Sequence, residues 1–239
     1  MKQILLGNEA FARGAYEAGV RVATAYPGTP STEILENFCK YDGVYAQWST
    51  NEKVAVEVAI GAALAGEKAM AVMKHVGVNV AADPVFTVSY TGTNGALVIV
   101  TADDPSLHSS QNEQDNRNYA RFAKIPMLEP ADAAEAKHYI KMAFEISARF
   151  DTPVFFRTTT RVSHSKSVVT LEEPAVYEDK TGFVYNAEKY VMVPHCARIR
   201  RVEVEKRQQA LKEFAETFPE NKVEITNAEA GIITAGMPY

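Results

Sequence analysis

Glu52 is the residue whose type and setting most directly suggest chemistry. It lies at the start of a predicted helix over residues 51–66, which follows a predicted strand at 44–48. Small residues recur along this helix at three- and four-residue steps, so one helix face carries almost no side chain: Ala55, Ala59, Ala62 and Gly66. Such a face lets another backbone or a flat ligand approach closely. A carboxylate in the first turn is also favoured by the positive end of the helix dipole.

A purely structural role for Glu52 is the stronger interpretation from spacing alone. Ser49 and Glu52 have the spacing of a capping box, in which the glutamate only satisfies a free backbone N–H group. Capping glutamates are common, so the spacing does not by itself indicate a ligand.

A second candidate lies in the turn after a predicted buried strand at 20–25: Tyr26-Pro27-Gly28-Thr29-Pro30. Thr29 is predicted to be the N-cap and Pro30 the first residue of the following helix. A strand, a glycine-containing turn and a helix start together present free N–H groups to an anion. The alternative is that Thr29 only caps its helix.

His75 follows a predicted apolar strand at 68–73. Ligands collect at the carboxyl ends of strands in open parallel sheets, which makes His75 a candidate for proton transfer. A loop histidine bonded to backbone is the alternative. The connection 103–118 is polar and long, and it carries further polar candidates: His108, Gln111, Glu113, Gln114, Asp115 and Arg117. Their spacing fits no metal-site template, so no metal site is predicted.

Alternating strand and helix patterns up to residue 165 predict an α/β domain with a doubly wound, mostly parallel sheet. Its other predicted strands are 96–102, 127–129 and 153–157, and its other predicted helices are 9–18, 84–90 and 132–149. Asp83 and Pro84 are predicted to open the second of these helices. Residues 166–230 are interpreted as a linker with a charged helix at 198–218, and 231–239 as the first strand of a truncated further α/β domain.

Composition narrows the class of protein. A chain of 239 residues with 46% hydrophobic residues can bury a large core, and a net charge of -5 argues against nucleic acid as a partner. Cys39 and Cys196 have no CxxC spacing, so they predict neither an iron–sulfur cluster nor a zinc site and suit a reducing cytoplasm. The N-terminal apolar run is too short for a signal peptide, and no run reaches the roughly 18 apolar residues of a membrane span.

Four stretches carry a resemblance to a known family: residues 25–33, 49–66, 73–84 and 102–117. The first reads Ala-Tyr-Pro-Gly-Thr-Pro-Ser-Thr-Glu and the third Met-Lys-His-Val-Gly-Val-Asn-Val-Ala-Ala-Asp-Pro. Together they resemble the thiamine-diphosphate-dependent 2-oxoacid:ferredoxin oxidoreductases, and most closely the pyrimidine-binding region of the alpha subunit of the indolepyruvate enzymes. The resemblance covers most of the chain.

The resemblance implies roles for the candidate residues. Glu52 would hydrogen-bond a nitrogen of the cofactor's pyrimidine ring, in a dry pocket that favours a shared proton. Pro27, Gly28 and Thr29 would lie beside the cofactor, with Thr29 also near the substrate carboxylate, and His75 would belong to the catalytic site. Arg117 or Arg121 could bind the 2-oxoacid carboxylate bidentately, and the sequence does not choose between them.

The implied reaction is the oxidative decarboxylation of an aryl pyruvate to an aryl-acetyl-coenzyme A, with reduction of ferredoxin. No Gly-Asp-Gly segment and no cysteine-rich motif occurs in the chain. Mg²⁺ and 4Fe–4S clusters are therefore expected in a missing part or a partner chain, and the chain alone is expected to be inactive. Expected partners are the diphosphate-binding domain or subunit, a beta or gamma subunit, ferredoxin through the complex, and further copies in an oligomer.

Three other interpretations remain open. The same domain could serve an oxidoreductase for another 2-oxoacid, because no residue sets the aryl preference. It could instead be a non-catalytic scaffold or dimerisation module, for which Glu52 would be dispensable. A Rossmann-type nucleotide-binding protein is disfavoured because no GxGxxG follows the first strand.

Overall fold

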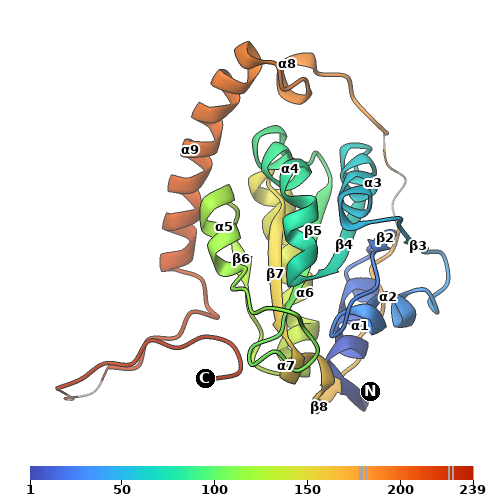
Figure 1. Ribbon diagram of the computed structural model, residues 1–239, viewed down its shortest axis with the longest axis vertical. Coiled ribbons are helices and arrows are strands. Elements are labelled where there is room, and N and C mark those ends of the chain that lie inside the picture. The colour runs from blue at the N-terminus through green and yellow to red at the C-terminus, as the bar shows by residue number, and fades with distance from the viewer. Residues whose placement is uncertain (178–179, 181, 226, 228, 239) are drawn as a thin grey trace.

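The computed structural model describes residues 1–177, 180, 182–225, 227 and 229–238. Its centre is a sheet of six parallel strands in the order β3-β2-β4-β5-β7-β6 (Figure 1). The strands are β2 (Val22–Ala25), β3 (Tyr45–Trp48), β4 (Lys68–Lys74), β5 (Ala96–Asp103), β6 (Met127–Leu128) and β7 (Val154–Thr159). The predicted α/β class and doubly wound parallel sheet are confirmed.

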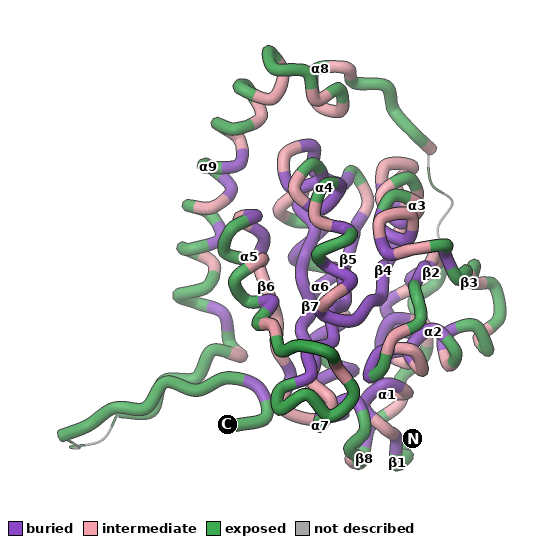
Figure 2. Tube along the Cα trace, viewed as in Figure 1, coloured by how far each residue is buried: buried purple, intermediate pink, exposed green. Residues whose placement is uncertain are grey.

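The central strands are apolar on both faces, which is why they lie in the core. Every residue of β5 is buried, and β4 is buried from Ala69 onward (Figure 2). Parallel strands covered on both faces show continuous apolar runs rather than an alternation. The edge strand β3 is mostly exposed.

Helices cover both faces of the sheet. One face packs against α1, α2 and α6 through a core that includes Phe11, Ile34 and Phe144. The other packs against α3, α4 and α5, with Val56 and Val78 in a second core. The bounds are α1 (Gly7–Glu17), α2 (Thr32–Phe38), α3 (Glu52–Leu64), α4 (His75–Thr91), α5 (Arg117–Ala123) and α6 (Ala133–Phe150).

The strand order reverses between β2 and β4. The chain passes from β2 through α2 to β3, then returns through α3 to β4 on the other side of β2. Helix α2, which follows β2, and helix α4, which follows β4, cover opposite faces, so the chain leaves these two neighbouring strands toward opposite faces at the carboxyl edge, where α/β proteins bind ligands. The small face of α3 packs against the sheet: Ala55 and Ala59 are fully buried, and the Thr24 hydroxyl of β2 donates a hydrogen bond to the Ala55 carbonyl at 2.6 Å.

Two predicted helix-opening motifs are wrong. Helix α4 begins at His75 and runs through Asp83 and Pro84, so the prediction that these two residues open a helix is wrong. Buried Val78, Ala81 and Val85 continue the helical apolar spacing across this point, and their packing overrides the local Asp-Pro signal.

The second difference is in α2, which begins at Thr32 with Ser31 in the N-cap position. The predicted N-cap role of Thr29 and first-residue role of Pro30 are therefore wrong. The Gly28 carbonyl accepts hydrogen bonds from the Ser31 N–H and hydroxyl, both at 2.9 Å, which places the turn before the helix.

A second, two-stranded sheet pairs the N-terminus with the segment after the domain. Strands β1 (Lys2–Leu6) and β8 (Lys166–Thr170) are antiparallel, and α7 (Thr160–His164) precedes β8. The start of the stretch interpreted as an irregular linker is therefore a strand, because β1 supplies a distant pairing partner. The described residues of 231–238 form no strand. Their assignment to a further domain stays a prediction.

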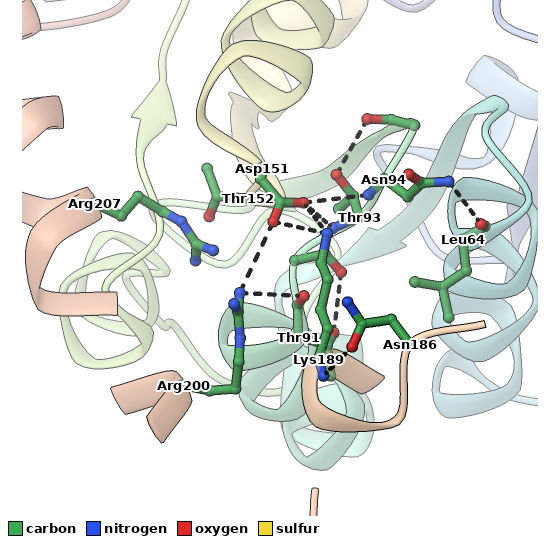
Figure 3. Close-up of polar contacts among 12 residues, drawn as sticks. Leu64, Thr91, Thr93, Asn94, Asp151, Thr152, Asn186, Lys189, Arg200 and Arg207 are labelled. Carbon is green, nitrogen blue, oxygen red and sulfur yellow. Dashed lines mark hydrogen bonds and ion pairs between the residues drawn. The ribbon is translucent and has the colours of Figure 1, made fainter. Parts of the chain in front are cut away.

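The linker is tied to the domain by a contact that we call the linker clasp: Asp151, Lys189 and Arg200 (Figure 3). Asp151 ends α6 and accepts hydrogen bonds from the Thr93 N–H at 2.8 Å and from the Lys189 ammonium at 3.0 Å. Lys189 lies in α8 (Ala187–Tyr190), and Arg200 lies in α9 (Pro194–Glu216), the predicted charged helix.

In the described part of the chain, no helix is both long and apolar enough to cross a bilayer.

Candidate active site

The candidate site lies at the carboxyl edge of the sheet, beside the reversal of strand order. Three segments meet there: the turn 26–31 after β2, the start of α3 after β3, and the start of α4 after β4. The loop 104–116 after β5 lies against the start of α4 and adds a wall. Parallel strands place all these connections at the same edge.

Glu52 is the first residue of α3 but does not cap it. Asn51 is the N-cap, and its side-chain oxygen accepts a hydrogen bond from the Val54 N–H at 3.0 Å. The Ser49 hydroxyl is buried without a hydrogen-bond partner, so the capping-box interpretation of Ser49 and Glu52 is wrong. Glu52 is only 9% exposed, and no group among the described residues hydrogen-bonds its carboxylate. Its oxygens are therefore available to a ligand.

The Glu52 carboxyl group lies against the first turn of α4. A Cβ atom built on Gly77 would lie 2.6 Å from Oε1 of Glu52 and 2.9 Å from its Cδ. Gly77 is buried, so its bare Cα forms the floor under the carboxyl group. Loop and helix ends from three strands thus enclose one nearly buried acid.

The turn 26–31 lies on Lys74, the last residue of β4. A Cβ atom at Gly28 would be 3.0 Å from the Lys74 Cβ, so the two backbones approach closely. Thr29 is exposed, precedes a cis peptide bond to Pro30, and makes no hydrogen bond to the described residues. The structure thus places Gly28 and Thr29 beside the end of β4, at the same sheet edge as Glu52, with a free threonine hydroxyl among the described residues.

Lys74 and His75 hold the loop 104–116. The Lys74 ammonium donates a hydrogen bond to the Ser109 carbonyl at 2.7 Å, and Nε2 of His75 lies 3.1 Å from the Asn112 carbonyl. Because a carbonyl oxygen only accepts, this His75 nitrogen carries its proton. His75 is fully buried, and its Nδ1 has no partner among the described residues. Its observed contact fixes the loop, and its predicted catalytic role stays a prediction.

Asp104 organises the same loop from its other side. One oxygen accepts hydrogen bonds from the Ser109 N–H at 2.8 Å and the Ser110 hydroxyl at 2.6 Å, and the other accepts from Thr160 at 2.7 Å. Burial opposes ionisation of this carboxyl group, but these hydrogen bonds outweigh it and lower the pKa of Asp104. Asp104 is therefore a stable anion that joins the loop to α7.

For Asp103, burial outweighs the interactions that favour the ionised carboxylate. Burial raises the pKa of its carboxyl group, although Arg157 donates a hydrogen bond to it at 2.7 Å and opposes the shift. Arg157 also pairs with Glu129 at the end of β6. This buried ion pair joins β5 to β7 directly behind the loop.

The two arginines considered for substrate binding lie elsewhere. Arg117 pairs with Asp115 at 2.8 Å, and both Arg117 and Arg121 line a cleft of about 690 Å³ between α5, α6 and α9. None of Thr29, Glu52 or His75 lines that cleft. The structure does not bring the arginines and Glu52 into one pocket, and their substrate role stays a prediction.

Sequence reasoning missed three residues of the site: Lys74, Gly77 and Asp104. The sequence shows that Lys74 ends an apolar strand and that Gly77 lies in a predicted loop or helix start. It does not show which distant residues these two contact. Among the described residues, no group of three or more His, Cys, Asp or Glu side chains is placed to hold a metal ion.

The chain matches known proteins along its length. The family model described as pyruvate flavodoxin/ferredoxin oxidoreductase, thiamine diP-binding, matches residues 13–227. Indolepyruvate oxidoreductase subunit IorA of Archaeoglobus fulgidus is 47% identical over 100% of this chain and 40% of its own length. The corresponding Methanothermobacter marburgensis subunit is 48% identical over 97% of this chain and 38% of its own.

A more distant relative is 2-oxoglutarate synthase subunit KorA of Archaeoglobus fulgidus, 29% identical over 71% of this chain and 51% of its own. Among solved structures, 2-oxoglutarate:ferredoxin oxidoreductase from Magnetococcus marinus superimposes with a TM-score of 0.71 at 16% identity. It covers 96% of this chain and 48% of that chain, and it confirms the fold. The chain spans about two fifths of the length of the IorA relatives. It belongs to the pyruvate flavodoxin/ferredoxin oxidoreductase family and carries that family's thiamine diphosphate-binding domain.

Proposed function

We propose that this chain is the pyrimidine-binding part of a thiamine-diphosphate-dependent oxidoreductase that converts indolepyruvate to an aryl-acetyl-coenzyme A and passes electrons to ferredoxin. One structural observation carries the site assignment: Glu52 is only 9% exposed, and its carboxylate oxygens, which still reach the surface, have no hydrogen-bond partner among the described residues. A carboxylate that sits in a largely buried side chain and that no protein group satisfies is open to an incoming ligand, which is its natural partner.

The residues present fit the cofactor. Glu52 offers a carboxyl group to a ring nitrogen, and the bare Gly77 backbone leaves room beside it. Pro27, Gly28 and Thr29 form the facing turn, which contributes backbone groups and one free hydroxyl. When bound, thiamine diphosphate supplies a carbon nucleophile that attacks 2-oxoacids and accepts the electron pair released by decarboxylation.

Glu52 has one chemical task in this proposal, which is to hold a proton at the ring nitrogen. No protein donor competes for its oxygens, and fully buried Ala55 and Val56 exclude water from the helix side. A carboxyl group in such surroundings shares its proton with a ligand nitrogen more strongly than it would in water. Thr29 is assigned to the substrate carboxylate, which its free hydroxyl could reach from the turn.

The remaining chemistry belongs to parts outside this chain. Mg²⁺, the diphosphate site and 4Fe–4S clusters are assigned to another domain or subunit, together with contacts to ferredoxin, coenzyme A and further copies. Relatives that are more than twice as long support this division. Two unpaired thiols, Cys39 and Cys196, support a reducing cytoplasm.

The test is reconstitution of the whole enzyme from this chain and its diphosphate-binding part, with thiamine diphosphate and Mg²⁺. Glu52→Gln should reduce indolepyruvate-dependent viologen reduction by about 10²-fold or more, in the range of general acid–base groups. Glu57→Gln on the same helix is the matched control, because that side chain is half exposed and should leave turnover unchanged. Full activity of Glu52→Gln would favour the scaffold interpretation.

The similarity to a KorA subunit favours one second candidate, an enzyme for 2-oxoglutarate or a related acid. A panel of indolepyruvate, phenylpyruvate, pyruvate and 2-oxoglutarate separates the two. An aryl enzyme should have its highest kcat/KM with the first two acids.

A further inference from the structure

The contact between Gly77 and Glu52 is unusually close. A Cβ atom on Gly77 would lie 2.6 Å from Cγ, 2.6 Å from Oε1 and 2.9 Å from Cδ of Glu52. Carbon atoms in van der Waals contact lie about 3.5–4.0 Å apart, so the carboxyl group occupies space that any other residue at this position would fill. We propose that Gly77 is a positioning residue, whose missing side chain seats the Glu52 carboxyl group where it meets the cofactor ring.

Two other glycines, Gly7 and Gly95, lie against main-chain atoms and have a purely structural role. A Cβ atom at Gly7 would lie 1.9 Å from the Val162 carbonyl oxygen, and one at Gly95 would lie 2.2 Å from the Glu67 carbonyl oxygen. Substitution at either position would force main-chain segments apart. At Gly77, all three nearest atoms belong to the end of one flexible side chain, so a substitution there displaces the acid rather than the backbone.

Gly77 also has no conformational need to be glycine. It lies in the first turn of α4 with helical backbone, which alanine adopts more readily than glycine does. Stability alone would thus favour alanine at this position. The bare Cα instead leaves space for an acid that has no hydrogen-bond partner in the described chain to hold it.

The inference rests on the proposed function, because the position that Gly77 gives to the Glu52 carboxyl group matters only if Glu52 binds a ligand. Hydrogen bonds weaken steeply when distance and angle leave their narrow range. An added methyl group should push the carboxyl group away from Gly77 and misalign its hydrogen bond to the ring nitrogen. The fold should remain intact.

The experiment uses the reconstituted whole enzyme and compares Gly77→Ala with Gly61→Ala. Gly61 is a matched control, because it lies in the neighbouring helix α3 and a Cβ atom there meets nothing within 4 Å. Both variants should keep or raise the Tm of the cofactor-free enzyme. Gly77→Ala should weaken thiamine diphosphate binding about tenfold, as expected for loss of a hydrogen bond to a charged group, and Gly61→Ala should leave it unchanged.

A double-mutant cycle then tests whether Gly77 acts through Glu52. In a Glu52→Gln background, Gly77→Ala should change the thiamine diphosphate dissociation constant less than about twofold, because the acid is already gone. Equal losses in both backgrounds, a clear drop in the cofactor-free Tm, or unchanged binding by Gly77→Ala would each overturn the positioning role while leaving the proposed function intact. Wild-type binding and turnover by Glu52→Gln would overturn both.

Discussion

Lys74 donates a hydrogen bond from its ammonium group to the Ser109 carbonyl oxygen at 2.7 Å, although 35 residues separate the two. The stem of the same lysine packs under Gly28, where an added Cβ would be 3.0 Å from its Cβ. One side chain at the end of β4 therefore contacts the turn 26–31 on one side and the loop 104–116 on the other. It sets the spacing between two walls of the candidate site.

Replacing Lys74 by methionine keeps the stem and removes the hydrogen bond. Lys74→Met should loosen the loop 104–116 and raise its amide hydrogen exchange, while the sheet stays protected. The cost in stability should be about 1 kcal/mol, because one hydrogen bond is lost without leaving a buried charge. Lys53→Met is the control, since the Lys53 side chain is 43% exposed and pairs only at the surface. Equal exchange of the loop in both variants would contradict the role given to Lys74.

Asp104→Asn should change how stability depends on pH. The folded-state pKa of Asp104 is lowered, so its contribution is present above the ordinary value of 3.8 and is lost as the pH falls below it. Asparagine cannot accept the same three hydrogen bonds with a full charge. The variant should lose about 1.5–3 kcal/mol near neutral pH and less in acid. Urea unfolding at several pH values measures this, and a pH-independent loss would contradict it.

Much of the fold could be predicted because its signals are local. The apolar runs of β4 and β5 and the helix that starts near Glu52 are visible in short windows of sequence. The N-cap is Asn51, one residue before Glu52. Where Ser, Thr and Asn occur in a row, the sequence does not show which of them caps the helix.

The rest depends on contacts between distant residues. The pairing of Ile4 with Val168 makes β8 a strand, and nothing within either segment names its partner. In the same way, the reason for a glycine at position 77 is seen only in the fold, where Glu52 packs against it. The ion pair of Arg117 with Asp115 likewise becomes visible only in the fold, and the substrate role of Arg117 stays a prediction.

Arg157→Met should destabilise the fold more than Lys74→Met or Asp104→Asn does. Arg157 is 5% exposed and pairs with fully buried Asp103 at 2.7 Å, so its loss leaves a buried carboxylate unpaired. Breaking a buried pair in this way costs about 3–5 kcal/mol.

The pH dependence of that loss has a definite sign. Burial already raises the pKa of Asp103, and removing Arg157 raises it further. A raised folded-state pKa means that stability is lost as the pH rises from 3.8 through the folded value, so Arg157→Met should be least destabilising in acid. The double variant Arg157→Met with Asp103→Asn should recover part of the loss at neutral pH. No recovery in urea unfolding would show that the unpaired carboxylate is not the cause.

Lys189→Met should open the linker clasp without unfolding the domain. Lys189 and Asp151 are partly exposed and 2.9 Å apart, so the pair is expected to add at most about 1 kcal/mol. Its effect should be local: α8 would detach from the end of α6, and the preceding segment, whose Phe183 and Tyr185 are already exposed, would gain the freedom to enter a protease active site. Chymotrypsin should then cut faster at Phe183 and Tyr185, while the urea midpoint barely moves. Lys206→Met is the control, because Lys206 pairs only with Glu203 of its own helix. If chymotrypsin cut both variants at the same rate, the clasp would not hold the linker to the domain.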